Sequence, residues 1–128
     1  MSGRKQSFVI ASGEVTLERA TRADSVLLSN LLELCAYVLS ELFSTDIGAD
    51  GRFGDSKLPL YWTETKRRFA FLIQVSRRTA GFALVTRGSP VSDKVEDLDM
   101  AEFFVLRRHR RSGVGRHAAR LIWDRIPE

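Results

Sequence analysis

The 128-residue chain has few of the residues that stabilise small secreted or metal-binding domains, with one cysteine, two histidines and three prolines. Cys35 has no second cysteine to pair with, which excludes a disulfide-stabilised scaffold. Cys35, His109 and His117 are together too few to supply the four ligands of a zinc site built from cysteines and histidines, so we expect no structural metal. The low proline content excludes collagen-like or linker sequence.

Long hydrophobic runs are also lacking. The first 13 residues contain an apolar run of four, at 8–11, which is too short for a signal-peptide core. The most apolar stretch, 26–43, is interrupted by serine, asparagine and glutamate, so we expect no membrane span and a cytoplasmic protein. The composition of 44% hydrophobic and 28% charged residues is typical of one globular domain, expected to occupy residues 1–128.

Charge is unevenly distributed along the chain, whose net charge is +4. Residues 107–128 carry seven arginines against two acidic residues, whereas residues 1–106 carry 13 basic and 14 acidic groups. This asymmetry indicates an anionic partner, such as a nucleic acid, a phosphorylated cofactor or an acidic protein.

Hydrophobic periodicity predicts an α/β fold, with a mixed, mostly antiparallel central sheet flanked by helices. A capping box at Thr21 and Asp24 introduces the first helix. The apolar runs 69–75 and 80–86 are typical of an antiparallel hairpin. We expect strands at 13–19, 69–75, 80–86 and 99–106, a first helix that follows the Thr21 cap and runs to about residue 42, and further helices at 60–68 and 114–126.

The first predicted helix has one strongly apolar face, and Cys35 lies on it. We interpret Cys35 as a small buried hydrophobe rather than a nucleophile, because no histidine is near it in sequence. Tyr61 and Trp62, in the second helix, are interpreted as packing residues. The predicted buried face consists of Leu27, Leu31, Leu34, Cys35, Val38 and Leu42.

The segment 105–116 joins a strand to a helix through a turn that contains Gly113 and Gly115. Glycines allow tight backbone conformations and close approach of a ligand, and a helix N-terminus presents unpaired N–H groups. The turn therefore predicts a site for a phosphate or diphosphate.

Three classes of ligand fit such a turn. A P-loop nucleotide is disfavoured, since the Gly-Lys-Ser/Thr signature is missing and no lysine follows Lys94. The spacing Gly113-x-Gly115-x-x-Ala118 matches a dinucleotide fingerprint, but the acidic residue expected about 20 residues later would lie beyond Glu128. The third class is coenzyme A.

For coenzyme A, the segment Arg110-Arg111-Ser112-Gly113-Val114-Gly115 resembles the cofactor loop Arg/Gln-x-x-Gly-x-Gly/Ala of the GNAT superfamily of N-acetyltransferases. The preceding Glu102-Phe103-Phe104-Val105-Leu106 looks like that family's central strand, and the hairpin with Gly81-Phe82-Ala83 is similar to its first half. The resemblance spans about residues 14–126. It implies the GNAT fold and direct transfer of the acetyl group of acetyl-CoA to a primary amine.

The resemblance also implies roles for individual residues. The strand end would line the pantetheine arm, and the turn would hold the diphosphate. The arm residues are Phe104, Val105 and Leu106, and the phosphate residues are Arg110, Arg111, Ser112, Gly113, Val114, Gly115 and Arg116. For the arginines, a solvated surface run is the alternative interpretation.

Glu102 is the candidate catalytic base. An alkylammonium with a pKa of about 10.4 is almost fully protonated at neutral pH, so acyl transfer needs a base. Strict alternation places Glu102 beside Met100, Phe104 and Leu106, an apolar setting that would raise the pKa of its carboxyl group. The alternative is a structural glutamate that faces solvent or pairs with an arginine.

Two other functions remain open. One is a coenzyme-binding or regulatory module without complete catalytic machinery. The other is nucleic-acid binding, which is disfavoured because aromatic stacking residues are not interleaved with the arginines.

GNAT members usually continue after this helix with another strand, a further helix and a closing hairpin, which we expect this chain to lack. The strand 99–106 would then have an open edge, and Leu121, Ile122 and Trp123 would be exposed. Open apolar edges pair with other chains, which predicts a homodimer.

Overall fold

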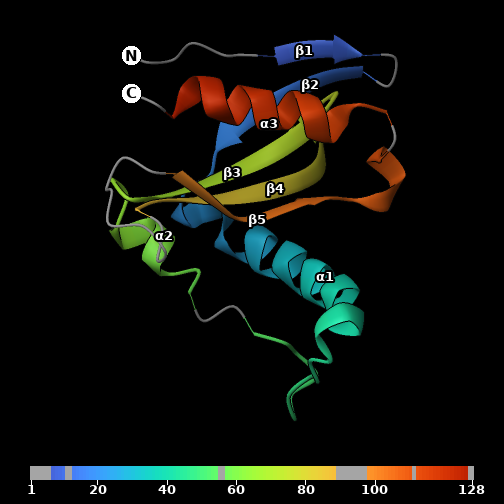
Figure 1. Cartoon of the computed structure of the whole chain (residues 1–128), viewed down its shortest axis with the longest axis vertical. Helices are drawn as coiled ribbons and strands as arrows, with labels where there is room; N and C mark the ends of the chain where they lie inside the picture. Colours follow the sequence, from blue (N-terminus) through green and yellow to red (C-terminus); the bar gives the residue numbers. More distant parts are fainter. Residues whose placement is uncertain (1–6, 11–12, 55–56, 89–97, 111, 127–128) are drawn as a thin grey trace.

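Five strands pair in the order in which they occur in the chain, forming an antiparallel meander (Figure 1). This confirms the predicted, mostly antiparallel sheet flanked by helices. The strands are β1 (Ser7–Ile10), β2 (Gly13–Arg19), β3 (Arg68–Val75), β4 (Arg78–Arg87) and β5 (Leu98–Val105). The computed structural model describes residues 7–10, 13–54, 57–88, 98–110 and 112–126.

The helices and short turns lie between these strands or after the last of them. They are η1 (Arg22–Asp24), α1 (Ser25–Phe43), α2 (Leu60–Thr63), η2 (Arg107–His109) and α3 (Val114–Arg125). The capping box is confirmed, since the Thr21 N–H donates to Asp24 Oδ2 at 2.9 Å. The prediction of helix over 60–68 is wrong beyond Thr63, because the chain turns there and enters β3 at Arg68.

One face of the sheet is covered by α3, which lies in front of β2 and between β1 and β3 in Figure 1. Leu121 and Ile122 are buried against β2, β3 and β4 residues such as Val15 and Ile73. The expectation that these two residues would be exposed is therefore wrong: the sheet itself covers them. Trp123 points the other way and is 42% exposed.

The opposite face is covered by α1 and α2, but the buried stripe of α1 differs from the predicted one. Leu27, Leu34 and Leu42 are 37%, 50% and 76% exposed. Leu31 and Cys35 are buried as predicted and Val38 packs against the same cluster, so the predicted face is only partly wrong. This helix is apolar nearly all round, and periodicity alone did not set the exact face. The buried residues of α1 are Leu28, Leu31, Leu32 and Cys35.

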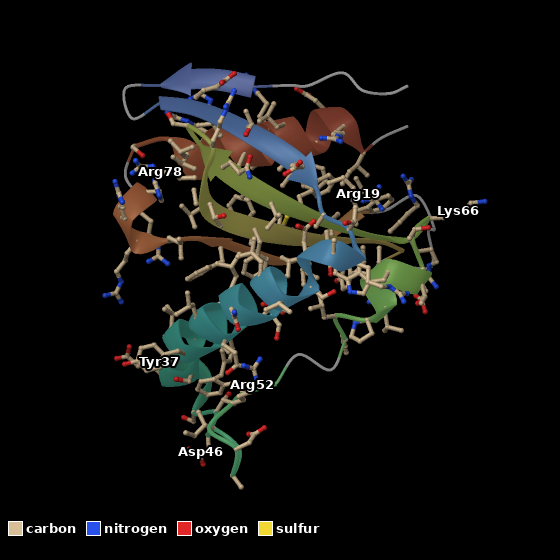
Figure 2. The ribbon with its side chains drawn as sticks, turned by 180° about the vertical axis from the view of Figure 1, so that it is seen from behind. Arg19, Tyr37, Asp46, Arg52, Lys66 and Arg78 are labelled. Carbon is tan, nitrogen blue, oxygen red and sulfur yellow. The ribbon has the colours of Figure 1, made fainter. Side chains whose placement is uncertain are left out.

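The exposed side of α1 remains apolar, and Tyr37 projects from it away from the sheet (Figure 2). By length and composition, the segment Arg22–Phe43 is apolar enough to cross a membrane, with a mean hydropathy of 1.6 over its most apolar window. A mostly buried core helix passes the same test. In α1 only 22% of that window is buried, through residues such as Leu28, Leu31 and Leu32 that contact the sheet.

Among the described strands, β5 lies at one edge of the sheet, in agreement with the open edge expected for strand 99–106. The register shifts by one residue opposite the Leu84–Val85 step, where Ala101 has no partner. Met100 consequently packs on the α3 side, whereas Phe104 and Leu106 pack on the α1 side. The predicted sharing of one face by Glu102 and Met100 is therefore wrong.

Candidate functional site

The turn between β5 and α3 is built around a glycine in a left-handed conformation. Gly113 has φ 86° and ψ 2° and stands at the N-cap of α3, where no side chain caps the helix. If a Cβ were added to Gly113, its nearest atom apart from the two chain neighbours would be His117 Cδ2, at 3.5 Å. The Ser112 hydroxyl donates to the His109 carbonyl at 2.8 Å and fixes the approach to the helix. The helix N-terminus is thus open to an anion.

The residues predicted to hold phosphate differ in what they can offer. Val114 is 1% exposed and belongs to the core, so only its backbone can reach a ligand. Gly115 packs close to Phe103, which would lie 3.7 Å from an added Cβ. Arg116 is exposed, and Arg111 lies outside the described residues.

Two arginines of the basic segment are engaged within the protein. Arg110 Nε donates to the Val105 carbonyl at 2.7 Å, with its guanidinium 5.3 Å from the centre of the Phe104 ring. Arg125 donates to the Leu17 carbonyl at 3.0 Å. The C-terminal charge excess is therefore partly structural.

At the end of β5, the backbone groups rather than the side chains are available to a ligand. Phe104 and Val105 are each 8% exposed and pack on opposite faces of the sheet. The Leu106 N–H donates to Ala80 in β4 at 2.7 Å. Because successive N–H groups of a strand point to opposite sides, those of Phe103 and Val105 point to the open edge. An extended arm that pairs with this edge would compete with Arg110 for the Val105 carbonyl.

Glu102 lies beside Cys35 of α1, a contact that the sequence did not reveal. The Cys35 thiol donates to Glu102 Oε1 across 3.7 Å. Burial raises the pKa of the Glu102 carboxyl group, and the thiol partly offsets this. Burial and the neighbouring carboxylate raise the pKa of Cys35 to about 11, so the thiol stays protonated at neutral pH. This supports the interpretation of Cys35 as a buried residue rather than a nucleophile.

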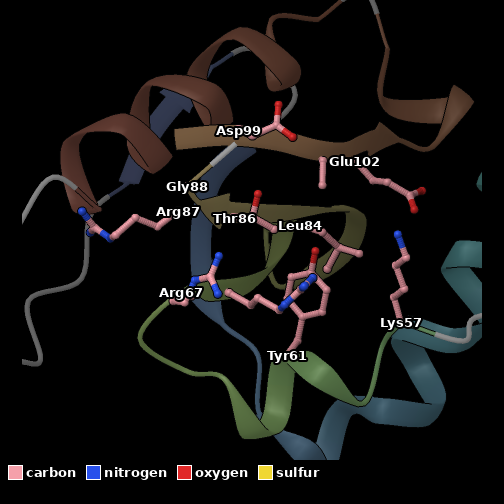
Figure 3. A pocket seen from close by; sticks show the side chains of 11 residues that line it. Lys57, Tyr61, Arg67, Leu84, Thr86, Arg87, Gly88, Asp99 and Glu102 are labelled. Carbon is pink, nitrogen blue, oxygen red and sulfur yellow. The ribbon is translucent and has the colours of Figure 1, made fainter. Parts of the chain in front are cut away.

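A pocket of about 480 Å³ lies beside Glu102 (Figure 3). The unpaired Ala101 changes the alternation of β5, so that Asp99, Ala101 and Glu102 all line this pocket. Tyr61 of α2 forms the facing wall together with cationic side chains. Those cationic residues are Lys57, Arg67 and Arg68, and Arg87 of β4 also lines the pocket.

Tyr61 is fixed in this wall. It is 4% exposed, and the Arg68 guanidinium lies 5.6 Å from the centre of its ring. Burial raises the pKa of the Tyr61 phenol despite the nearby Arg68, so the hydroxyl is protonated at neutral pH. Arg68 is itself held by Glu64 at 2.8 Å.

From the sequence, Tyr61 was expected only to pack, and no role was predicted for Lys57, Arg67 or Asp99. Their signal is weak, because the pocket forms from segments up to 45 residues apart. The two histidines stay near the turn, where burial and nearby arginines lower the pKa of His109. Among the described residues, no group of three histidines, cysteines or acidic residues could hold a metal ion.

The fold is that of an acetyltransferase. A crystal structure of an acetyltransferase from Thermus thermophilus is similar to the chain, with a TM-score of 0.65 and 20% sequence identity. The similarity covers 86% of this chain and 68% of the other. No family profile and no curated protein sequence matches the chain.

Proposed function

We propose that this chain is an N-acetyltransferase of the GNAT superfamily, which transfers the acetyl group of acetyl-CoA directly to a primary amine. The observation that carries the proposal is the position of Glu102. It is a half-buried carboxylate in a pocket beside the open edge of β5, and that edge leads to the turn at Gly113. The acetyltransferase fold agrees with this arrangement.

The turn fits the diphosphate of coenzyme A. A Cβ added to Gly113 would make only ordinary contacts, the shortest at 3.5 Å, and Gly113 has no side chain to cap the first N–H groups of α3. We assign the diphosphate to the backbone of Ser112, Gly113 and Gly115, with Arg116 adding positive charge. Acetyl-CoA supplies an activated thioester carbonyl when bound.

In the proposed reaction, Glu102 removes a proton from the acceptor ammonium and passes it to solvent. The nitrogen lone pair then forms the new C–N bond while the C–S bond of the thioester breaks. The sulfur leaves as a thiolate and takes up the second proton that the nitrogen releases. Cys35 needs no covalent role, since its thiol remains protonated beside Glu102.

Calorimetry with acetyl-CoA tests the proposal directly. Gly113→Val places a branched side chain at a φ of 86°, over the helix N-terminus, and we expect it to abolish binding. Gly51→Val is the matched control, because Gly51 also has a positive φ, of 80°, lies in the loop after α1 and has nothing within 4 Å of an added Cβ, so binding should persist.

Circular dichroism should show that both variants remain folded. Equal affinity of the wild type and a folded Gly113→Val variant would contradict the assignment. A wild type that binds no acetyl-CoA would contradict it as well.

A further inference from the structure

We infer that the pocket beside Glu102 takes a small amine that also carries a carboxylate or phosphate, with Arg67 binding this anionic group. The inference rests on the proposed acetyl transfer and names the class of acceptor. It is carried by the way charge is divided between the two walls of the pocket.

The wall formed by β5 is acidic. Asp99 and Glu102 both line the cavity there, because the unpaired Ala101 brings them to the same side of the strand. Two carboxylates on one wall favour an ammonium group near the reacting end of the pocket. They hold the amine where Glu102 can take its proton.

The opposite wall is basic. Lys57, Arg67 and Arg68 come from the segment 57–68, and Figure 3 shows Lys57 and Arg67 on the far side of the cavity from β5. With Arg87 from β4, four cationic groups face two carboxylates, so a polyamine would meet an excess of like charge.

These four cations are not equally available to a ligand. Arg68 is paired with Glu64 at 2.8 Å, and Arg87 donates to the Ile126 carbonyl at 3.1 Å. Figure 3 places Lys57 toward the Glu102 end of the cavity. Arg67 lies away from that end and forms no ion pair with any described residue.

Arg67 therefore has a guanidinium that can bind an anion through two parallel N–H groups. A volume of about 480 Å³ suits a small molecule. A zwitterionic acceptor would place its ammonium against β5 and its anionic group against Arg67.

Two matched pairs of amines test the inference and separate the two possible anions. β-Alanine is compared with its amide, and phosphoethanolamine with ethanolamine, at fixed ionic strength. Both equilibrium binding by calorimetry and thiol release from acetyl-CoA are measured. We expect at least one anionic member to bind about tenfold more tightly than its neutral counterpart, and spermidine to bind worst.

The Arg67→Gln variant should remove this preference, raising the KM for the anionic amine about tenfold at nearly unchanged kcat. Lys66→Gln is the control, because it removes the same charge at the residue just before Arg67. Lys66 does not line the pocket and projects away from the protein (Figure 2). It should leave the preference intact.

The inference is overturned if the anionic amines do not bind, or if they bind no more tightly than their neutral counterparts. So does a preference that survives Arg67→Gln. Failure of the proposed acetyl transfer is distinguishable, because it would abolish thiol release with every amine while leaving the binding preference and its loss in Arg67→Gln in place.

Discussion

Gly81 is the residue whose replacement should most directly disturb the strand that carries the site. It lies in β4 opposite Val105 of β5, and a Cβ at this position would stand 2.1 Å from the Phe104 carbonyl oxygen. The same Cβ would lie 3.0 Å from the Val105 Cα. Both neighbours are backbone atoms, so no side chain can rotate away to relieve the overlap.

For Gly81→Ala we expect a loss of about 2–3 kcal/mol in the free energy of unfolding. A carbon and an oxygen in contact need about 3.2 Å, so β5 must move by roughly 1 Å, and overpacking of this kind costs about 1–3 kcal/mol. The shift also weakens neighbouring cross-strand hydrogen bonds, such as that from Leu106 N–H to the Ala80 carbonyl at 2.7 Å, each worth about 1 kcal/mol.

Urea unfolding followed by circular dichroism measures this loss. With a slope of about 2 kcal/mol per molar, the midpoint should fall by about 1 M or more. Gly115→Ala is the control: its Cβ would meet Phe103 at 3.7 Å, and alanine in a helix gains about 0.5–1 kcal/mol over glycine. The reasoning is refuted if Gly81→Ala unfolds at the wild-type midpoint, or if Gly115→Ala loses as much.

Three further outcomes are expected. Glu102→Gln should lower turnover at neutral pH by about 10²-fold with little change in acetyl-CoA affinity, as measured by steady-state kinetics and calorimetry; unaltered rates would make Glu102 a structural residue. Because burial raises the pKa of Glu102 and the thiol of Cys35 opposes this, the acid limb of the wild-type kcat/KM profile should lie above the ordinary pKa of a glutamate. Cys35→Ala should move that limb to higher pH, and Cys35→Ser should move it to lower pH. If both variants have the wild-type profile, the contact between Cys35 and Glu102 does not set the pKa of Glu102. Without acetyl-CoA, whose arm would occupy the end of the same edge, the open edge of β5 should pair with a second copy, giving a dimer by light scattering at micromolar concentration; a stable monomer would contradict this.

Local patterns were enough to predict most elements of the fold. The helix α3 and the hairpin strands follow from periodicity, and the capping box at Thr21 marked the start of the first helix. The hairpin turn is shorter than the predicted four residues, however, because Ser76 and Arg77 both adopt positive φ values of 50° and 69°. Two-residue turns of this kind favour glycine or asparagine, so the sequence carried no signal for it.

Contacts between distant segments were not predictable in the same way. Cys35 and Glu102 are 67 residues apart, and no local pattern relates them. The partly wrong choice of buried face on α1 has a related cause, since Leu27 and Leu28 suit burial equally and the sheet decides between them. For the turn at Gly113, by contrast, strand, glycine and helix are contiguous, and the local geometry followed from the sequence.

The residue that decides the chemistry of the pocket is Ala101, although it has no reactive group. With strict alternation, Asp99 would share a face with Phe103 and point into the apolar cluster under α3, where an unpaired carboxylate is strongly unfavourable. The extra residue at Ala101 lets Met100 fill that cluster and sends Asp99 to the side of Glu102. A bulge in an edge strand thus satisfies the core and builds an acidic wall at the same time. Glu102 reaches the cavity by ordinary alternation with Phe104, and the pairing register of β5 is what adds Asp99 beside it.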